Sequence, residues 1–306
     1  MNSGLRGARI GLIERRHPPG YRKALVDHLV PLLREEGAQV DLVHAEHGLH
    51  RLDAPPPWDL VVLKSGSAAA LHLAAAAESW GIPSVNGSEA TRLAQDKLAS
   101  AAIFQRAGLP IAPVHLAWLG PASVGSRAST SRSNKEERPS RSDDWRGGLA
   151  LFTERLDAVV DRALVVKSAR GSRGTGLWTV EAGELRPLAA RLPQGPYLLM
   201  EKIPHAGDDL KVYVAGGWIA AIERPFPAES LSAKLGRPAR VPEDVAAATR
   251  EAGRLLGLTC FGCDFVEGPG GWTLVDVNAF PGYKGAVGAP EALVAEISRT
   301  AEEVRR

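Results

Sequence analysis

The N-terminal part of the chain alternates between short runs of apolar residues and a segment with helical apolar spacing. Residues 8–13 and 38–43 are apolar runs, and residues 21–36 between them place apolar side chains three and four positions apart before Gly37. Short apolar runs predict strands, whereas the helical spacing predicts an amphipathic helix that ends at the glycine. The chain therefore begins with a predicted strand, helix and strand.

The same alternation continues to about residue 86. The run DLVVLK, which ends at Lys64, is typical of a buried parallel strand, and an alanine-rich stretch from about 68 to 80 predicts the next helix. We therefore expect residues 1–86 to form a small, open α/β domain.

The middle of the chain is predicted to contain a helix, a glycine-rich turn between two strands, and one polar insertion. Residues 88–108 predict one long helix that ends at glycine, and residues 163–180 have the pattern of strand, glycine-rich turn and strand. Residues 121–148 are rich in serine, arginine, glycine and proline and have almost no apolar side chains. Such a composition cannot support packing, so we expect a disordered surface insertion there.

Two hairpins and two helices are predicted for the C-terminal part. One hairpin turns at Gly216 and Gly217, and a second spans residues 260–278 around the turn EGPGGW. Residues 244–258 carry an apolar stripe at helical spacing, and residues 290–306 predict a final helix. Antiparallel hairpins beside helices favour an α+β arrangement over a second doubly wound sheet.

Composition and charge exclude several classes of protein. Of 306 residues, 44% are hydrophobic and 24% are charged, which suits a soluble protein of two or three subdomains. The formal net charge of +2 gives no global field that would attract nucleic acid, so we expect no nucleic acid partner. The apolar stretch near the N-terminus is too short for a signal peptide or a membrane span. We therefore expect a cytoplasmic protein that has no membrane partner.

The two cysteines have the C-x-x-C spacing of some zinc and redox sites. Cys260 and Cys263 lie on a predicted strand, where side chains three positions apart point to opposite faces, and the chain has no second cysteine pair. We therefore expect neither a zinc site nor a redox site at these residues.

The most informative polar residues lie on the two strands of the last predicted hairpin. Asp276 and Asn278 are two positions apart and so share one face of their strand, and hairpin pairing can bring Asp264 beside them. Magnesium that bridges nucleotide phosphates takes only one or two carboxylates from the protein and keeps several waters. The three side chains therefore predict a magnesium site, although solvated acids at strand ends are the alternative.

A glycine-rich loop follows an apolar strand that ends at a lysine. Lys167 is followed by the sequence SARGSRGTG, which includes Gly171, Ser172, Gly174 and Gly176. Backbone amides in such a loop and the lysine ammonium group can together surround a phosphate group. The loop is neither a Walker motif nor a dinucleotide-binding motif, because a strand follows it and not a helix.

The order of six short motifs resembles the ATP-grasp superfamily over residues 88–290. The motifs are residues 95–97 (QDK), 166–167 (VK) with the glycine loop, 200–203 (MEKI), 208–211 (DDLK), 262–264 (GCD) and 276–278 (DVN). The resemblance implies that residues 87–199 form the central lobe, that residues 200–306 form the C-terminal lobe, and that ATP binds between them.

The resemblance also implies a role for each motif residue. Lys97 and Lys167 would contact the α- and β-phosphates, and the loop from Gly171 to Gly176 would close over the triphosphate. The adenine strand would comprise Glu201, Lys202 and Ile203. Asp209 would hold the ribose, and Lys211 and Arg224 would face the γ-phosphate. Two Mg²⁺ ions, with Mn²⁺ able to replace them, would bind Asp264, Asp276 and Asn278.

Within the superfamily the chain looks similar to the RimK-like ligases, which add amino acids such as glutamate to carboxylates. The similarity lies in residues 220–224 (AAIER) and 278–285 (NAFPGYKG). These ligases usually have Glu at the position of Asp276 and Arg at that of Lys211. The motif around Asp276 also looks similar to inositol trisphosphate kinases, so a kinase that phosphorylates a hydroxyl stays open, as does a degenerate domain that only binds nucleotide.

Candidates for the acceptor site come from the N-terminal domain and from the segment after Arg224. Lys64 and Arg16 follow predicted parallel strands, at the edge where ligands gather in open α/β sheets, and Lys234 lies in the weakly matching segment 225–242. The resemblance implies small-molecule or peptide substrates, one with a carboxylate and one with an amine. The sequence gives no signal for the oligomeric state.

Overall fold

A computed structural model provides the fold of the chain. It describes residues 4–16, 24–119, 163–169, 176–205, 207–226 and 230–304. The predicted insertion at 121–148 lies outside the described residues. Two compact units make up the chain: residues up to Ile111 together with those from Ile203 onward form the first, and Ala112–Lys202 form the second. Among the helices of the described ranges, none combines the length and apolar character that crossing a bilayer requires.

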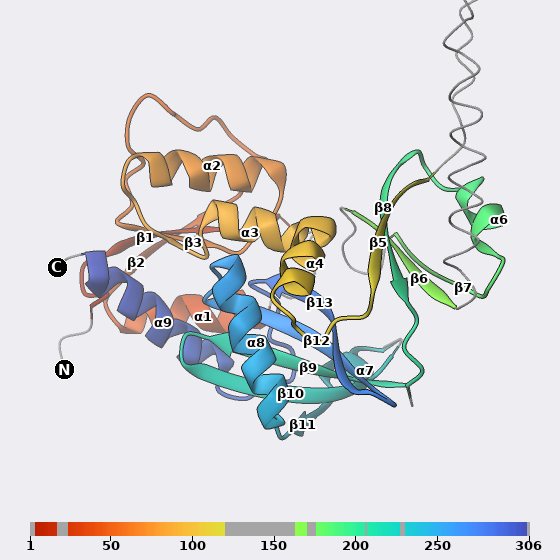
Figure 1. The fold of residues 1–306 in the computed structure, drawn as a ribbon. Helices are drawn as coiled ribbons and strands as arrows, with labels where there is room; N and C mark the ends of the chain where they lie inside the picture. The colour runs from red at the N-terminus through yellow and green to blue at the C-terminus, as the bar shows by residue number, and fades with distance from the viewer. Residues whose placement is uncertain are drawn as a thin grey trace, which may run out of the picture. The chain divides into compact units, whose positions relative to one another are not determined.

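The first unit begins with a parallel sheet, as the alternating pattern predicts. Its strands have the order β2-β1-β3-β4, and the α/β prediction for this region is confirmed. The elements are β1 (Arg9–Ile13), α1 (Ala24–Glu35), β2 (Gln39–Val43), β3 (Leu60–Leu63), α2 (Ala68–Ser79) and β4 (Ser84–Val85). Residues of α2 pack on one face of the sheet, and residues of α1 and of the C-terminal helix α9 (Ala289–Val304) pack on the other (Figure 1).

The predicted single helix over 88–108 is wrong, because the structure has two helices there. These are α3 (Ser88–Gln95) and α4 (Lys97–Arg106). Asp96 between them has a non-helical backbone, and its carboxylate accepts hydrogen bonds from the amides of Leu98 and Ala99 at 3.2 and 3.0 Å. An aspartate that caps the second helix competes with continuation of the first. The break places Lys97 at the first position of α4.

The second sheet of this unit contains both predicted hairpins, which are confirmed. Its five strands are antiparallel and have the order β11-β10-β9-β12-β13. The elements are β9 (Asp208–Ala215), β10 (Trp218–Pro225), α7 (Leu231–Leu235), β11 (Arg237–Ala239), α8 (Glu243–Leu256), β12 (Cys260–Gly268) and β13 (Gly271–Ala279). Helix α7 and strand β11 fall where the sequence predicts only a polar connection.

Alternation along these strands separates two cores. Cys263 packs in one core together with residues of α3, α4 and α8, whereas Cys260 packs in the other with residues of α1 and α9. The prediction that the two cysteines face opposite sides is therefore confirmed. On β9 the same alternation places Tyr213 and Lys211 on the face of Cys260.

The second unit is an antiparallel sheet of order β5-β8-β6-β7 with one short helix. Its elements are β5 (Val114–Leu119), β6 (Leu164–Ser168), β7 (Leu177–Val180), α6 (Leu185–Ala189) and β8 (Gly195–Glu201). Leu185 and Leu188 of α6 pack with Val166, Tyr197 and Leu199 on one face of the sheet. The predicted strand, turn and strand over 163–180 is confirmed for its two strands, β6 and β7.

Candidate functional site

Strand register brings the three predicted magnesium ligands together. Asp264 of β12 lies directly opposite Asp276 of β13, and the register shifts between Asp264 and Phe265. Asn278, two residues beyond Asp276 on the same face, donates a hydrogen bond from Nδ2 to Asp276 Oδ2 at 3.3 Å. Two carboxylates and one amide therefore converge on one face of the antiparallel sheet.

Each of the two carboxylates forms an ion pair with a lysine. Lys97 at the start of α4 donates to Oδ1 of Asp276, and Lys211 of β9 donates to Oδ1 of Asp264. The side chains of the second pair are only 10% and 13% exposed. Charged side chains that are this well shielded from water are tolerated because they are paired. Removal of either partner would leave the other charge buried and poorly solvated.

Arg224 joins this group from the adjacent strand β10. Its guanidinium group donates to both oxygens of Asp209, with Nε–Oδ1 and Nη2–Oδ2 distances of 2.8 and 2.7 Å. Its Nη2 atom also lies 3.9 Å from Oδ2 of Asp264. The hydrogen bonds with Asp209 raise the pKa of Arg224 above its ordinary value. The arginine therefore stays charged at every working pH.

We refer to Asp209, Lys211, Arg224, Asp264, Asp276 and Asn278 as the charged face of the sheet. The oxygens of Asp264, Asp276 and Asn278 match the hard ligands that Mg²⁺ prefers when most other positions are water or phosphate. The part of the chain that the structure describes contains no cluster of three or more His, Cys, Asp or Glu side chains arranged for a metal. Asp264, Asp276 and Asn278 supply three oxygen ligands, which fit an ion whose other positions are filled by phosphate and water.

The nucleotide candidates of the second unit lie at strand ends. Lys167, near the end of β6, is 8% exposed and lies opposite Leu177 and Leu198 on the flanking strands. Glu201 ends β8, and Lys202 follows it with its Nζ atom 3.2 Å from Oε1 of Glu181. Ile203 begins the second of the two stretches that make up the other unit.

Of the predicted phosphate loop, only its last glycine is described. Gly176 has a φ of +79°, and its carbonyl accepts a hydrogen bond of 2.7 Å from the amide of Ser168. A Cβ atom at this position would lie 2.9 Å from that of Ser168, so the turn requires glycine. Gly171, Ser172 and Gly174 lie outside the described residues.

The three acceptor candidates occupy different parts of the first unit. Arg16 is exposed and follows β1, and Lys234 is exposed on α7. Lys64 follows β3, and its Nζ atom donates to the carbonyl oxygen of Phe280 at 2.8 Å. No contact among the described residues joins these three cations. Their assignment to an acceptor stays a prediction.

Sequence reasoning missed three aromatic residues that fix the backbone around the charged face. Tyr213 donates to the carbonyl of Lys284 at 3.2 Å, and Tyr283 donates to the carbonyl of Val214 at 2.6 Å. The ring of Phe280 is 2% exposed. Tyr213 is two positions from Lys211, so strand alternation could have placed it on the same face. Tyr283 and Phe280 lie on a loop that has no periodic pattern.

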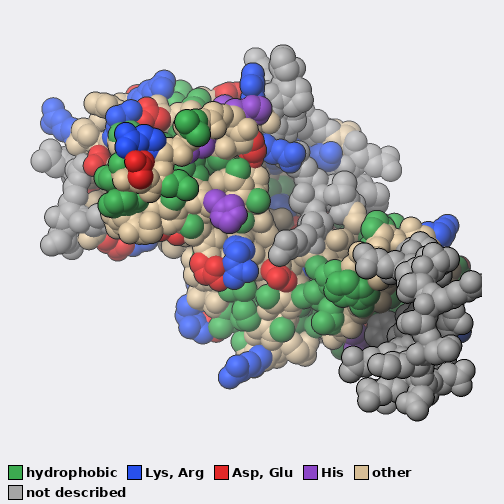
Figure 2. Space-filling view, turned by 90° about the horizontal axis from the view of Figure 1, so that it is seen from above, with side chains coloured by type: hydrophobic (Ala, Val, Ile, Leu, Met, Phe, Trp, Pro, Cys, Tyr) green, Lys and Arg blue, Asp and Glu red, His purple; other side chains and the backbone are tan. Residues whose placement is uncertain are grey.

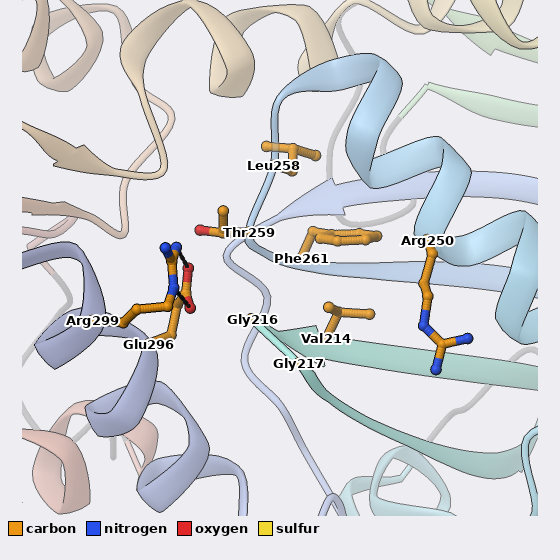
Figure 3. A pocket seen from close by; sticks show the side chains of 9 residues that line it. All are labelled: Val214, Gly216, Gly217, Arg250, Leu258, Thr259, Phe261, Glu296 and Arg299. Atoms are coloured by element: carbon orange, nitrogen blue, oxygen red, sulfur yellow. Dashed lines mark hydrogen bonds and ion pairs between the residues drawn. The ribbon is translucent and has the colours of Figure 1, made fainter. Parts of the chain in front are cut away.

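A separate cavity of about 350 Å³ lies at the opposite end of β9 and β12 from the charged face (Figure 3). Gly216, Thr259 and Phe261 line it, and α9 contributes Glu296 and Arg299, which are joined by hydrogen bonds of 2.8 and 2.7 Å. No predicted site residue lines this cavity.

Charges of both signs lie side by side on one face of the molecule. Figure 2 shows lysine and arginine side chains scattered among acidic ones over the face in view. On the charged face, strand register creates the grouping of positive and negative charges.

Comparisons with known proteins agree with this architecture. No family model matches the chain. A probable alpha-L-glutamate ligase of Thioalkalivibrio sulfidiphilus (strain HL-EbGR7) is 26% identical over 218 residues, which cover 68% of this chain and 63% of that protein. A probable alpha-L-glutamate ligase 2 of Shewanella sp. (strain MR-4) is 26% identical over 248 residues, which cover 76% of this chain and 73% of the relative. The matched region thus spans less than two thirds of the first relative.

Solved structures match over nearly the whole chain. A RimK domain ATP-grasp protein from Sphaerobacter thermophilus DSM 20745 has a TM-score of 0.69 and 18% identity, with coverage of 96% of this chain and 100% of that one. The D-alanine–D-alanine ligase from Bacillus anthracis complexed with ATP has a TM-score of 0.65 and 17% identity, with coverage of 98% and 99%. The ATP-grasp ligase PsnB complexed with precursor peptide and AMPPNP has a TM-score of 0.60 and 17% identity, with coverage of 96% and 98%. The chain therefore has the ATP-grasp fold that its sequence motifs predict, and it is similar to RimK-like ATP-grasp proteins and to probable alpha-L-glutamate ligases.

Proposed function

We propose that the protein is an ATP-dependent carboxylate–amine ligase that forms an amide or peptide bond. The observation that carries the proposal is the pairing of Asp264 with Asp276 on the charged face, beside Lys97, Lys211 and Arg224. Such a group can bind phosphate oxygens and the divalent ions between them. The ligase names of the similar proteins support the same reaction class.

The proposed nucleotide site keeps the roles that the motif residues imply. Lys97 and Lys167 would contact the α- and β-phosphates, Glu201 to Ile203 would flank the adenine, and Asp209 would reach the ribose. The metal ligands would be Asp264, Asp276 and Asn278. Two Mg²⁺ ions bound there would neutralise charge on the phosphate oxygens, and Mn²⁺ would serve in their place.

The proposed reaction has two steps. A carboxylate oxygen of the acceptor attacks the γ-phosphorus, the bond to the bridging oxygen breaks, and ADP leaves, which produces an acyl phosphate. An amine then attacks the acyl carbon, phosphate leaves, and the nitrogen loses a proton as the amide forms. Lys211 and Arg224 would hold the transferring phosphoryl group, since charge builds up on its oxygens. The glycine loop from Gly171 to Gly176 would keep water away from the acyl phosphate.

The acceptor would be a carboxylate of a small molecule or of a peptide, because a carboxylate of either kind can attack the γ-phosphorus. The sequence assigns recognition of its charge to Arg16, Lys64 and Lys234; of these, Arg16 and Lys234 are exposed cations that would meet the acceptor carboxylate. The comparisons reported above contain ligases and no kinase, so nothing in them favours phosphorylation of an inositol phosphate hydroxyl. A cytoplasmic location is proposed with the activity, because ATP is supplied there.

Product analysis with γ-labelled ATP tests this function. The enzyme is incubated with Mg²⁺ and either a panel of amino acids and small carboxylates or a panel of inositol phosphates. A ligase releases labelled inorganic phosphate only when a carboxylate and an amine are both present, and an equal amount of amide accumulates. Label that stays on an inositol phosphate product would show a kinase instead and would overturn the proposal.

A further inference from the structure

Two side chains at the carboxyl edge of the parallel sheet contact the open end of the hairpin that carries the three proposed metal ligands. Lys64 follows β3 and Asn86 follows β4. The hairpin strands are β12 and β13, and their open end lies between Cys260 and Phe280, because the amide of Phe280 donates to the carbonyl of Cys260 at 2.8 Å. Residues about 170 to 220 positions apart in the sequence therefore meet at this point.

Asn86 fixes the first residue of β12. Its Nδ2 atom donates to the carbonyl of Cys260 at 2.7 Å, and its Oδ1 atom accepts hydrogen bonds of 2.9 Å from the amides of Thr259 and Cys260. The Asn86 side chain is buried, so these bonds exchange little with water. The start of β12 is therefore held to the parallel sheet through three backbone groups.

Lys64 fixes the residue that follows β13. Its Nζ atom donates to the carbonyl oxygen of Phe280 at 2.8 Å and lies 5.6 Å from the centroid of the Phe280 ring. Phe280 has a φ of +40°, which is an unfavourable conformation for a bulky residue and needs support from surrounding contacts. The lysine supplies one hydrogen bond to the carbonyl and an attraction between its charge and the ring.

We propose that Lys64 is a positioning residue for the magnesium site, which it affects through Phe280. Asn278 and Asp276 lie two and four residues before Phe280 on one strand, so a shift at Phe280 moves both side chains. This inference rests on the proposed function, because the ion is the one that the ligase would use. It differs from direct contact between Lys64 and the acceptor, which is the role that the sequence predicts.

The two roles have different consequences. A positioning residue that acts on metal ligands changes metal affinity about 10- to 100-fold when it is removed, whether or not an acceptor is present. A residue that binds the acceptor carboxylate changes the acceptor KM and leaves metal binding unaltered. Measurement of metal binding without acceptor therefore separates them, and it does not depend on knowing the acceptor.

The test compares Lys64→Met and Lys64→Arg with the natural protein by electron paramagnetic resonance of Mn²⁺ binding in the presence of a non-hydrolysable ATP analogue. We expect Lys64→Met to weaken Mn²⁺ binding about tenfold or more, and Lys64→Arg, which keeps a charged donor, to recover most of the loss. Lys64→Gln, with a shorter neutral donor, should give an intermediate value. Arg254→Ala, which removes only an exposed pair with Glu251, is the matched control.

Circular dichroism and melting temperature establish that each variant is folded before binding is measured. Unchanged Mn²⁺ binding in folded Lys64→Met overturns the positioning role, and a raised acceptor KM alone would assign Lys64 to the acceptor. If the natural protein bound no Mn²⁺ with the ATP analogue, the magnesium site itself would be wrong. If metal binding followed the expected order but no amide formed with any acceptor, the ligase proposal would fail and the positioning role would stand.

Discussion

Asp209 and Arg224 face each other across β9 and β10 and are joined by two hydrogen bonds of 2.8 and 2.7 Å. Both oxygens of the carboxylate are thereby directed at the guanidinium group, whose Nη2 atom also approaches Asp264. Paired hydrogen bonds of this kind fix the plane of an arginine as well as its position. Asp209 therefore orients Arg224, whether or not it also reaches a ribose.

The first prediction concerns removal of this carboxylate. Asp209→Ala leaves the Arg224 guanidinium, whose side chain is 19% exposed, without its main partner. Loss of one partner from a buried pair costs about 3–5 kcal/mol, so the free energy of unfolding should fall by that order. Chemical denaturation followed by circular dichroism measures the change.

The matched control for Asp209→Ala is Glu251→Ala, which removes a carboxylate from the exposed pair with Arg254. Exposed pairs contribute little to stability, so its effect should be much smaller. Equal losses in the two variants would show that the Asp209–Arg224 pair is solvated in solution and does not orient the arginine.

The second prediction concerns the proposed magnesium ligands. Asp276→Ala and Asn278→Ala should each abolish ATP turnover, because each removes an oxygen from the proposed metal site. Both variants should keep the far-ultraviolet circular dichroism of the natural protein, since the two side chains are only partly buried at the end of β13. ADP formation is measured at saturating ATP and Mg²⁺.

Asp276→Asn keeps the size of the side chain and removes only the negative charge that pairs with Lys97. It should also lose turnover, since a neutral amide is a weaker magnesium ligand than a carboxylate. Normal turnover in Asp276→Ala or in Asn278→Ala would refute the metal assignment.

The third prediction uses the two buried thiols. Burial raises the pKa of Cys260 and of Cys263 above the ordinary value for a thiol. A group whose pKa is raised on folding gives stability that is complete below its unfolded pKa and is lost as pH rises toward the folded value. The free energy of unfolding should therefore fall as pH increases above about 9, where unfolded thiols ionise.

Urea unfolding between pH 7.5 and pH 10.5 measures this slope. Tyr213 and Tyr283, whose pKa values burial also raises, add to it near the upper end of that range. A variant with Cys260→Ala and Cys263→Ala should show a shallower fall between pH 8.5 and pH 9.5. If the free energy of unfolding of the double variant fell with pH as steeply as that of the natural protein, the raised thiol pKa would be contradicted.

Most secondary structure follows from the sequence because the apolar spacing of the strands and helices is regular. The charged face was predictable in part for the same reason: Asp276 and Asn278 share a face through strand alternation, and a hairpin places Asp264 beside them. The break at Asp96 was not predicted, because apolar spacing continues across it and only the capping bonds of the aspartate end the first helix.

Long-range contacts could not be predicted from periodicity. The bond from Lys64 to Phe280 joins residues 216 positions apart, and the positive φ of Phe280 on which it acts has no signal in the sequence. The pairing of Asp209 with Arg224 depends on strand register, and the sequence predicted the hairpin and its turn but not its register. Helix α7 is one short turn followed by Gly236, so its pattern is too brief for helical spacing to reveal it.

The central claim is that an acceptor carboxylate attacks the γ-phosphorus of ATP. Once an acceptor is found, its carboxylate is labelled with ¹⁸O and the phosphate released during amide formation is analysed by mass spectrometry. The account predicts one ¹⁸O atom in each phosphate, because the bond between the acyl carbon and that oxygen breaks when the amine attacks. Phosphate without ¹⁸O, formed at the same rate as the product, would contradict an acyl phosphate and the proposed ligase mechanism with it.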